Sequence, residues 1–286
     1  MRQREREWPI TLEYDGANDV SKSSAEIRDH VFANHLVVIK GMGGMAVQEF
    51  ANFAMLFGEP ETPLENTTLH PLDARVEVLK RTSHDVHYQH ALTEASEPGG
   101  TRKPSSFYWH ADRSFLPQPS SLTITRVVQS PRQGGNTEFI NTEIAYAALN
   151  DEQKDRLMGL VGVHSYAFYH AHLAGADKYT PEEISQKEAL YPPVTHPIVQ
   201  QHPVTGNSVA YTSPLTLAGF TDPEKGMEAQ STLEAILAED QPAFYSHAWQ
   251  TGDVVIWDNH GVLHRGSPST GERELHRMTL SLSEEK

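Results

Sequence analysis

The sequence predicts a mainly β protein with flanking helices, built as an antiparallel barrel or a two-sheet jelly roll. Short apolar runs recur from residue 121 to the C-terminus with turn residues between them, as in antiparallel folds. The strands do not alternate with helices in βαβ units, and no G-x-G-x-x-G phosphate loop is present, so a doubly wound parallel sheet is disfavoured. With 38% hydrophobic residues, the 286-residue chain can bury one core, and we expect a single domain over residues 1–286.

The N-terminal third is predicted to mix helices and a strand with two loops. Amphipathic spacing predicts helices over Ser24–Ala33 and Ala46–Phe57, and the apolar run His35–Lys40 between them predicts a strand. Segments 59–71 and 83–106 contain turn-forming residues without a sustained period, which indicates loops. Long loops are often lids, and we expect both to cover an active site.

The rest of the chain supplies most of the predicted strands. Helices are expected at Thr142–Leu149, Asp151–Leu160 and Glu228–Ala238. The expected strands are Ser121–Gln129, Asn136–Asn141, Val161–Tyr169, His196–Gln201, Ser208–Tyr211, Phe244–Trp249, Val254–Trp257 and Glu274–Leu282.

Composition excludes several classes of protein. Cysteine is absent, so disulfides, thiolate metal sites and cysteine nucleophiles are excluded, and any metal must be held by His, Asp or Glu. The net charge of −15 argues against binding to nucleic-acid phosphates. The N-terminus lacks the apolar core of a signal peptide, and no stretch has the length of a membrane span. We therefore expect a soluble cytoplasmic protein without nucleic-acid or membrane partners.

The first candidate for a metal site is the pair His110 and Asp112. On a strand, residues i and i+2 point to the same face and can bind one ion together. The signal is weak by itself, because chance supplies about 0.7 H-x-D matches in a chain of this composition. Most of the 16 histidines are expected to be structural.

A later histidine would complete a set of two imidazoles and one carboxylate. Such a set leaves three positions open on Fe(II), two for chelation by 2-oxoglutarate and one for O2. Spacing alone does not choose between His260 and His264. We favour His264, because it ends the apolar strand at Val262-Leu263, whereas His260 lies at a turn.

Five motifs follow one another along the chain. They are Trp109-His110-x-Asp112, Gly134-Gly135-x-Thr137, His196 to Gly206, Trp257-Asp258-Asn259 followed by His264, and Arg273-x-x-x-Arg277. In these motifs the chain resembles the taurine dioxygenase and 2,4-dichlorophenoxyacetate dioxygenase family over nearly its whole length. The resemblance implies a double-stranded β-helix with Fe(II), 2-oxoglutarate and O2, the iron being held by His110, Asp112 and His264.

The resemblance also implies a binding site for the distal carboxylate of 2-oxoglutarate at Thr137 and Arg273. A guanidinium suits this role, because it offers a planar two-donor fork to a buried carboxylate. Without the resemblance, a solvated charge on a surface strand would be the better interpretation of Arg273.

In relatives, the second arginine of the closing pair binds the sulfonate or carboxylate of the substrate, which implies that role for Arg277. Arg273 and Arg277 share one face of the closing strand, with their backbones roughly 13 Å apart, which favours two anions over one. The alternative is that Arg277 pairs with a local carboxylate such as Glu138, or supports the co-substrate site.

Three further residues are expected near the substrate: Ser106, four positions before the first iron ligand, and the aromatic residues Phe168 and Tyr169. The segment Ala210–Leu215 departs from the Asn-x-Gly-Phe pattern of relatives. These differences indicate a substrate other than taurine, and the role implied for Arg277 leads us to expect a small anionic one.

Two other classes of function use a similar ligand set. A metal-binding jelly roll without turnover is disfavoured by the two arginines and Thr137, and a zinc hydrolase by the lack of an evident general base. Halogenation is disfavoured because Asp112 is present. Hydroxylation with release of succinate and CO2 is expected, with desaturation or ring formation as variants. A homo-oligomer is compatible with the sequence.

Overall fold

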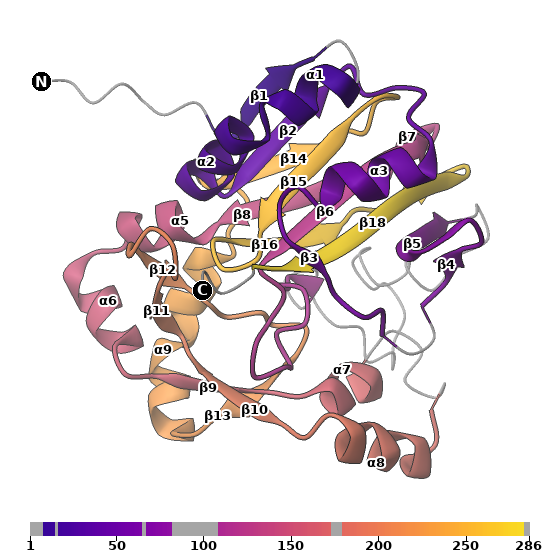
Figure 1. The fold of residues 1–286 in the computed structure, drawn as a ribbon. Helices are drawn as coiled ribbons and strands as arrows, with labels where there is room; N and C mark the ends of the chain where they lie inside the picture. The colour runs from indigo at the N-terminus through magenta and orange to yellow at the C-terminus, as the bar shows by residue number, and fades with distance from the viewer. Residues whose placement is uncertain (1–7, 15–16, 65–66, 82–107, 173–178, 283–286) are drawn as a thin grey trace, which may run out of the picture.

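The computed structural model describes residues 8–14, 17–64, 67–81, 108–172 and 179–282. Its major sheet has the strand order β1-β2-β15-β6-β18-β5-β4, with β3 paired to the end of β18 (Figure 1). Only β1 and β2 pair in parallel in this sheet. The strands are β1 Ile10–Glu13, β2 Leu36–Lys40, β3 Glu59–Pro60, β4 Leu69–His70, β5 Asp73–Arg81, β6 Leu122–Gln129, β15 Val254–Asp258 and β18 Arg273–Ser281.

A second antiparallel sheet, β14-β8-β16, shares a core with the major sheet. Its strands are β8 Thr137–Asn141, β14 Phe244–His247 and β16 Val262–Gly266. Smaller sheets are formed by β10-β9-β13, β11-β12 and β17-β7. Their strands are β7 Gln133–Gly134, β9 Val161–His164, β10 Val194–Pro197, β11 Val199–Gln201, β12 Ser208–Ala210, β13 Leu217–Phe220 and β17 Ser269–Thr270.

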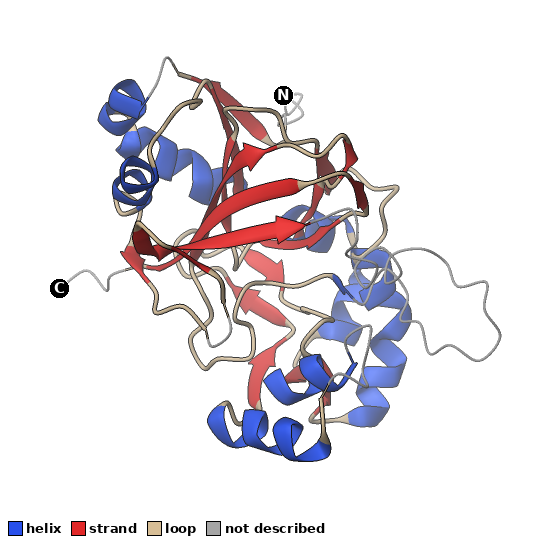
Figure 2. Ribbon diagram, turned by 90° about the vertical axis from the view of Figure 1, so that its right-hand side faces the viewer, coloured by secondary structure: helices blue, strands red, loops and turns tan. Residues whose placement is uncertain are grey.

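The described helices form two groups on opposite sides of the molecule (Figures 1 and 2). The N-terminal group covers the outer face of the major sheet and consists of α1 Ala17–Lys22, α2 Ser24–Asn34 and α3 Val47–Ala54. The second group consists of α5 Thr142–Ala148, α6 Asp151–Leu157, α7 Tyr166–His172, α8 Pro181–Leu190 and α9 Pro223–Ile236. None of the described helices combines the length and hydropathy that a membrane crossing requires.

Alternation along the central strands divides the core into two layers. On β2, Val37 and Ile39 pack beneath the N-terminal helices, whereas Leu36 and Val38 pack with Phe139 of the second sheet. Both faces of β2 and β15 are therefore buried, which explains why these strands read as unbroken apolar runs. The inner face, between the two sheets, is the one that carries polar residues of the site described below.

The structure confirms the mainly β composition with flanking helices and corrects several boundaries. The predicted strand Val161–Tyr169 is wrong beyond His164, because α7 begins at Tyr166, where the Ser165 hydroxyl accepts a hydrogen bond from the Phe168 N–H. Segment 59–71 begins with β3 and contains β4, so it is not wholly a loop. Segment 83–106 lies outside the described residues.

Candidate active site

Three side chains from distant parts of the sequence converge between the sheets. The ligand atoms of His110, Asp112 and His264 all lie within 4.8 Å of one another. Nε2 of His110 is 4.0 Å from Oδ1 of Asp112, and Nε2 of His264 is 3.7 Å from Oδ2. The structure therefore brings together the three residues that the sequence predicted as metal ligands.

Backbone pairing fixes the two histidines relative to each other. The His110 N–H donates to the His264 carbonyl at 3.0 Å, and the His264 N–H donates back at 2.8 Å. The two rings consequently lie 4.1 Å apart between centroids. The expected strand geometry holds at His110, whereas Asp112 begins a turn that continues through Arg113, whose φ is 58°.

Asp112 is held by two buried polar residues, Thr123 on β6 and Asn259 after β15. The Thr123 hydroxyl donates to Oδ2 of Asp112 at 2.7 Å, and the Asp112 N–H donates to Oδ1 of Asn259 at 3.0 Å. Nδ2 of Asn259 in turn donates to the Thr123 hydroxyl at 2.9 Å. Sequence reasoning gave Thr123 no role, because nothing in its strand pattern marks it, and it recorded Asn259 only as part of a motif.

The local electrostatics give all three side chains the protonation state of a metal ligand. Burial lowers the pKa of His110, and burial together with the neighbouring His110 lowers the pKa of His264 to about 3. Burial opposes ionisation of Asp112, but the Arg277 guanidinium holds its pKa below the usual range. Nδ1 of His110 lies 2.9 Å from the Tyr108 carbonyl, so it donates there and leaves the Nε2 lone pair directed at the site.

His260 lies apart from this cluster. Its ring is 6.0 Å from that of His202 and 6.5 Å from that of Tyr211. Within the described part of the chain, the groups of side chains that could hold a metal ion include His264 and leave out His260. The preference for His264 therefore agrees with the geometry.

The predicted co-substrate residues meet at the Gly134-Gly135 turn. Nη1 of Arg273 donates to the Gly135 carbonyl at 2.7 Å, and Thr137 follows two residues later at the start of β8. The Thr137 hydroxyl accepts a hydrogen bond from Nε1 of Trp249 at 3.0 Å. The sequence analysis placed Trp249 at the end of a predicted strand and gave it no role at the site, because it belongs to no motif.

Arg277 forms ion pairs with Glu77, directly opposite on β5, and with the candidate ligand Asp112. Its Nε donates to Glu77 at 2.8 Å, and its Nη1 donates to Oδ1 of Asp112 at 3.2 Å. Burial would lower the pKa of Arg277, but the two carboxylates raise it above the usual value. Glu138, the partner considered from sequence, instead accepts from Arg265 at 2.7 Å.

The aromatic residues expected near the substrate separate onto two sides of α7. Tyr169 lies beside Tyr166, with ring centroids 6.1 Å apart, and its phenol contributes to the raised pKa of Arg277. Phe168 instead stacks on His172, with centroids 4.2 Å apart. Successive side chains of a helix are about 100° apart, so Phe168 and Tyr169 leave α7 in different directions. Ser106 lies outside the described residues.

Two imidazole nitrogens and one carboxylate oxygen fit a mononuclear site of the two-histidine, one-carboxylate kind. The donors carry the protonation states that a divalent ion requires, and further positions of an octahedral ion would remain for other ligands. The donor set therefore fits a metal-dependent enzyme of the non-haem iron type.

The chain belongs to the taurine catabolism dioxygenase TauD, TfdA family, whose model matches residues 4–279. It is 30% identical over 264 residues to an alpha-ketoglutarate-dependent 2,4-dichlorophenoxyacetate dioxygenase of Burkholderia sp. (strain RASC), covering 90% of this chain and 86% of that protein. It is 26% identical over 263 residues to an alkylsulfatase of Acinetobacter baylyi, covering 89% and 75%.

The fold is similar to that in the crystal structure of AAD-2 in complex with Mn(II) and N-oxalylglycine, with a TM-score of 0.71 at 22% identity, covering 99% of this chain and 98% of that one. The family assignment makes the chain a 2-oxoglutarate-dependent dioxygenase, an oxidoreductase that uses Fe(II), 2-oxoglutarate and O2 and acts on a small organic molecule. It supports this function over a non-catalytic metal-binding jelly roll or a zinc hydrolase.

Proposed function

We propose that the chain hydroxylates a small anionic substrate, with His110, Asp112 and His264 as its iron ligands. The convergence of these three donors within 4.8 Å of one another is the observation that carries the proposal. When bound, Fe(II) and 2-oxoglutarate supply the reduction of O2 that is coupled to release of succinate and CO2 and to oxidation of the substrate. The protein's own part is to hold the ligands, orient both acids and exclude water.

Arg273 and Thr137 are proposed to bind the distal carboxylate of 2-oxoglutarate. Arg273 is only 4% exposed, so its guanidinium donors lie inside the protein rather than in solvent. Its contact to the Gly135 carbonyl directs the guanidinium toward the turn that precedes Thr137. A planar fork and a hydroxyl together match the acceptor pattern of a carboxylate.

Arg277 is proposed to bind the anionic group of the substrate. Its side chain is 22% exposed, so a solute can reach it. Glu77 holds one edge of the guanidinium, and Nη1 lies toward Asp112, on the side of the proposed iron. Two relatives are named for anionic compounds, a phenoxyacetate and alkyl sulfates, which supports an anion here. Tyr169 is proposed as an aromatic contact of the same substrate; for Ser106 and Phe168, substrate contact stays a prediction from the sequence.

We also infer that residues 1–286 form one domain with the topology of a double-stranded β-helix. The major sheet and the β14-β8-β16 sheet share a buried core layer, and the candidate ligands lie between them. This arrangement supports a jelly roll whose two sheets enclose the active site.

The iron ligands can be tested by anaerobic spectroscopy. Fe(II) and 2-oxoglutarate should give the weak visible charge-transfer band of the chelated complex. His264→Ala should remove this band because it deletes a ligand, and His260→Ala should leave it, since His260 lies outside the cluster. The ligand assignment is wrong if His260→Ala abolishes the band and His264→Ala does not. A screen of candidate acids for substrate-dependent succinate release would then identify the substrate.

A further inference from the structure

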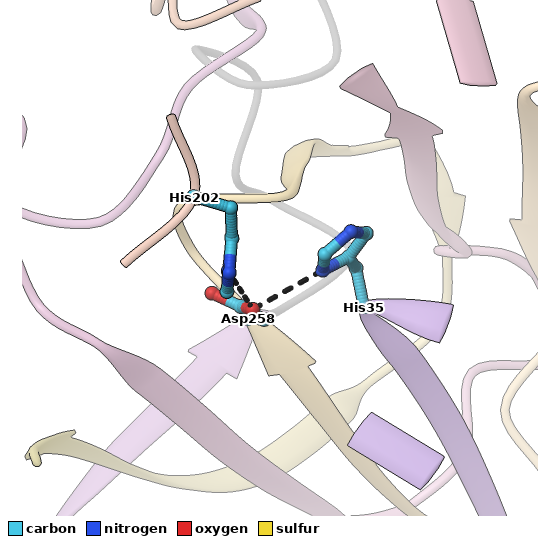
Figure 3. Close-up of side chains that lie close together, drawn as sticks. All are labelled: His35, His202 and Asp258. Atoms are coloured by element: carbon cyan, nitrogen blue, oxygen red, sulfur yellow. Dashed lines mark hydrogen bonds and ion pairs between the residues drawn. The ribbon is translucent and has the colours of Figure 1, made fainter. Parts of the chain in front are cut away.

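A second cluster of His and Asp side chains is fully buried near the end of β15. His35, His202 and Asp258 are 1%, 2% and 1% exposed. Figure 3 shows both histidines directed at the same carboxylate. Nδ1 of His35 lies 3.2 Å from Oδ2 of Asp258, and Nε2 of His202 lies 2.6 Å from the same oxygen.

The hydrogen-bond partners of this cluster indicate protons between the side chains rather than a metal ion. Nδ1 of His202 accepts from the backbone N–H groups of Val204 and Thr205, so its Nε2 carries the proton donated to Asp258. The second ring nitrogen of His35 lies 2.9 Å from Glu143, so both of its nitrogens face carboxylates. Burial would lower the pKa of His35, but Asp258 and Glu143 raise it to about 9, as expected of an imidazolium.

The cluster fixes the turn between β15 and β16. The Asp258 N–H donates to the His35 carbonyl at 3.0 Å, and Oδ1 of Asp258 accepts from the His260 N–H at 2.9 Å. The Gly261 N–H donates to the Asp258 carbonyl at 3.1 Å, which closes the turn. Asn259 lies inside this turn and is 1% exposed.

Asn259 connects the turn to the proposed iron site. Its side chain accepts from the Asp112 N–H and donates to Thr123, and Thr123 donates to the Asp112 carboxylate. Both the backbone and the carboxylate of Asp112 therefore depend on where the turn holds Asn259. Partners that orient a metal ligand are a recognised determinant of metal affinity.

We propose that His35, His202 and Asp258 form a positioning cluster that places Asn259, and through it the iron ligand Asp112. The proposal rests on the proposed ligand set. It assigns to three buried residues, none of which belongs to the proposed iron-ligand set, a role in metal binding rather than in folding alone.

Co(II) titration of the metal-free protein tests this proposal without turnover, with visible absorbance and dissociation constant as readouts. Asp258→Asn keeps the side-chain volume but removes the charge, and it should weaken Co(II) binding about tenfold. In an Asn259→Ala background the same change should weaken Co(II) binding by less than a further factor of about two, because the link from the turn to Asp112 is already lost.

Asp253→Asn is the matched control: Asp253 lies just before the opposite end of β15, is 1% exposed and pairs with His247 at 3.1 Å. It should lower the melting temperature comparably but leave Co(II) affinity within about twofold.

The proposal is overturned if Asp253→Asn weakens Co(II) binding as much as Asp258→Asn does, or if the Asp258 and Asn259 effects are independent. If Asp258→Asn does not fold, His35→Asn takes its place in the same comparison, since Asn tolerates the φ of 60° at this position. His264→Ala tests the ligand set separately from the positioning role. Unchanged Co(II) binding in His264→Ala would refute the ligand set itself. If His264→Ala loses Co(II) binding and Asp258→Asn leaves Co(II) affinity unchanged, only the positioning role is refuted.

Discussion

Arg273 and Arg277 are identical residues on one strand, but they have different surroundings, and different roles are proposed for them. Both lie on the inner face of β18, the face that also carries the buried Leu275. Arg273 is directed at a backbone carbonyl beside the Gly-Gly turn, whereas Arg277 is neutralised by Glu77 and Asp112. The first therefore lies at the proposed co-substrate site, and the second lies beside the proposed iron ligands.

Arg273→Ala is expected to raise the Michaelis constant for 2-oxoglutarate by one to two orders of magnitude, about what loss of a bidentate charged contact costs. Thr137→Ala should raise it less, because a hydroxyl contributes a single neutral hydrogen bond. Steady-state succinate release measures both. A normal constant for 2-oxoglutarate combined with a raised constant for the other substrate would reverse the roles of the two arginines.

Arg277→Met should raise the Michaelis constant for an anionic substrate and leave that for 2-oxoglutarate nearly unchanged. The single change also leaves Glu77, which is 3% exposed, without its charge partner. The double variant Glu77→Gln, Arg277→Met removes both charges and should give the same increase. Turnover of an uncharged substrate that is insensitive to either variant would contradict an anion-binding role.

At the scale of elements, the turn from β15 to β16 depends on a close approach to the end of α2. A Cβ atom on Gly261 would lie 2.1 Å from Cγ of His35. The ring of His35 is held by Asp258 and Glu143, so it cannot move aside without breaking those contacts. The sequence therefore needs glycine here for packing, although the φ of Gly261 is not positive.

Gly261→Ala should lower the free energy of unfolding by about 1–3 kcal/mol, the usual cost of overpacking a buried position. Urea titration followed by circular dichroism measures the change. Gly219→Ala is the control, because a Cβ there meets nothing within 4 Å, and its effect should stay within about 0.5 kcal/mol. Equal effects at the two positions would show that His35 is free to move.

At the scale of the whole molecule, buried histidines with opposite shifts predict an optimum of stability with pH. Asp258 and Glu143 overcome burial and raise the pKa of His35 from 6.5 to about 9, so its contribution is complete below pH 6.5 and is lost as pH rises through 9. Burial lowers the pKa of His164 to about 3, so the unfolded chain takes up a proton that the folded chain resists. The contribution of His164 is therefore present above pH 6.5 and is lost as pH falls toward 3.

The metal-free protein should accordingly be most stable near pH 6.5 and lose stability on both sides. His35→Asn should flatten the alkaline side of the stability curve. Each proton lost there lowers the free energy of unfolding by about 1.4 kcal/mol per pH unit. His30→Asn, at a partly exposed position of α2, is the matched control for the substitution itself. Melting temperatures measured from pH 4 to 10 would test this prediction. If the alkaline loss of stability persists in His35→Asn, a group other than His35 causes it.

Much of the fold could be predicted because its central strands are buried on both faces and so read as continuous apolar runs. Strands β2, β6, β8 and β15 were expected within one or two residues of their bounds. The nine residues of β5 were missed, because Asp73–Arg81 alternates charged and apolar side chains among loops. Glu77, the partner of Arg277, was missed with them.

The sequence by itself determined the chemistry available to this protein: a chain without cysteine, two histidines and an aspartate in metal-binding motifs, and two arginines at a spacing suited to two acids. Only the tertiary structure decided which groups meet. His264 rather than His260 reaches Asp112, Glu77 rather than Glu138 pairs with Arg277, and His35 joins a carboxylate 223 residues away. Local pattern fixes which face a side chain takes within its own strand or helix, whereas contacts across sheets depend on register and packing that no single segment encodes.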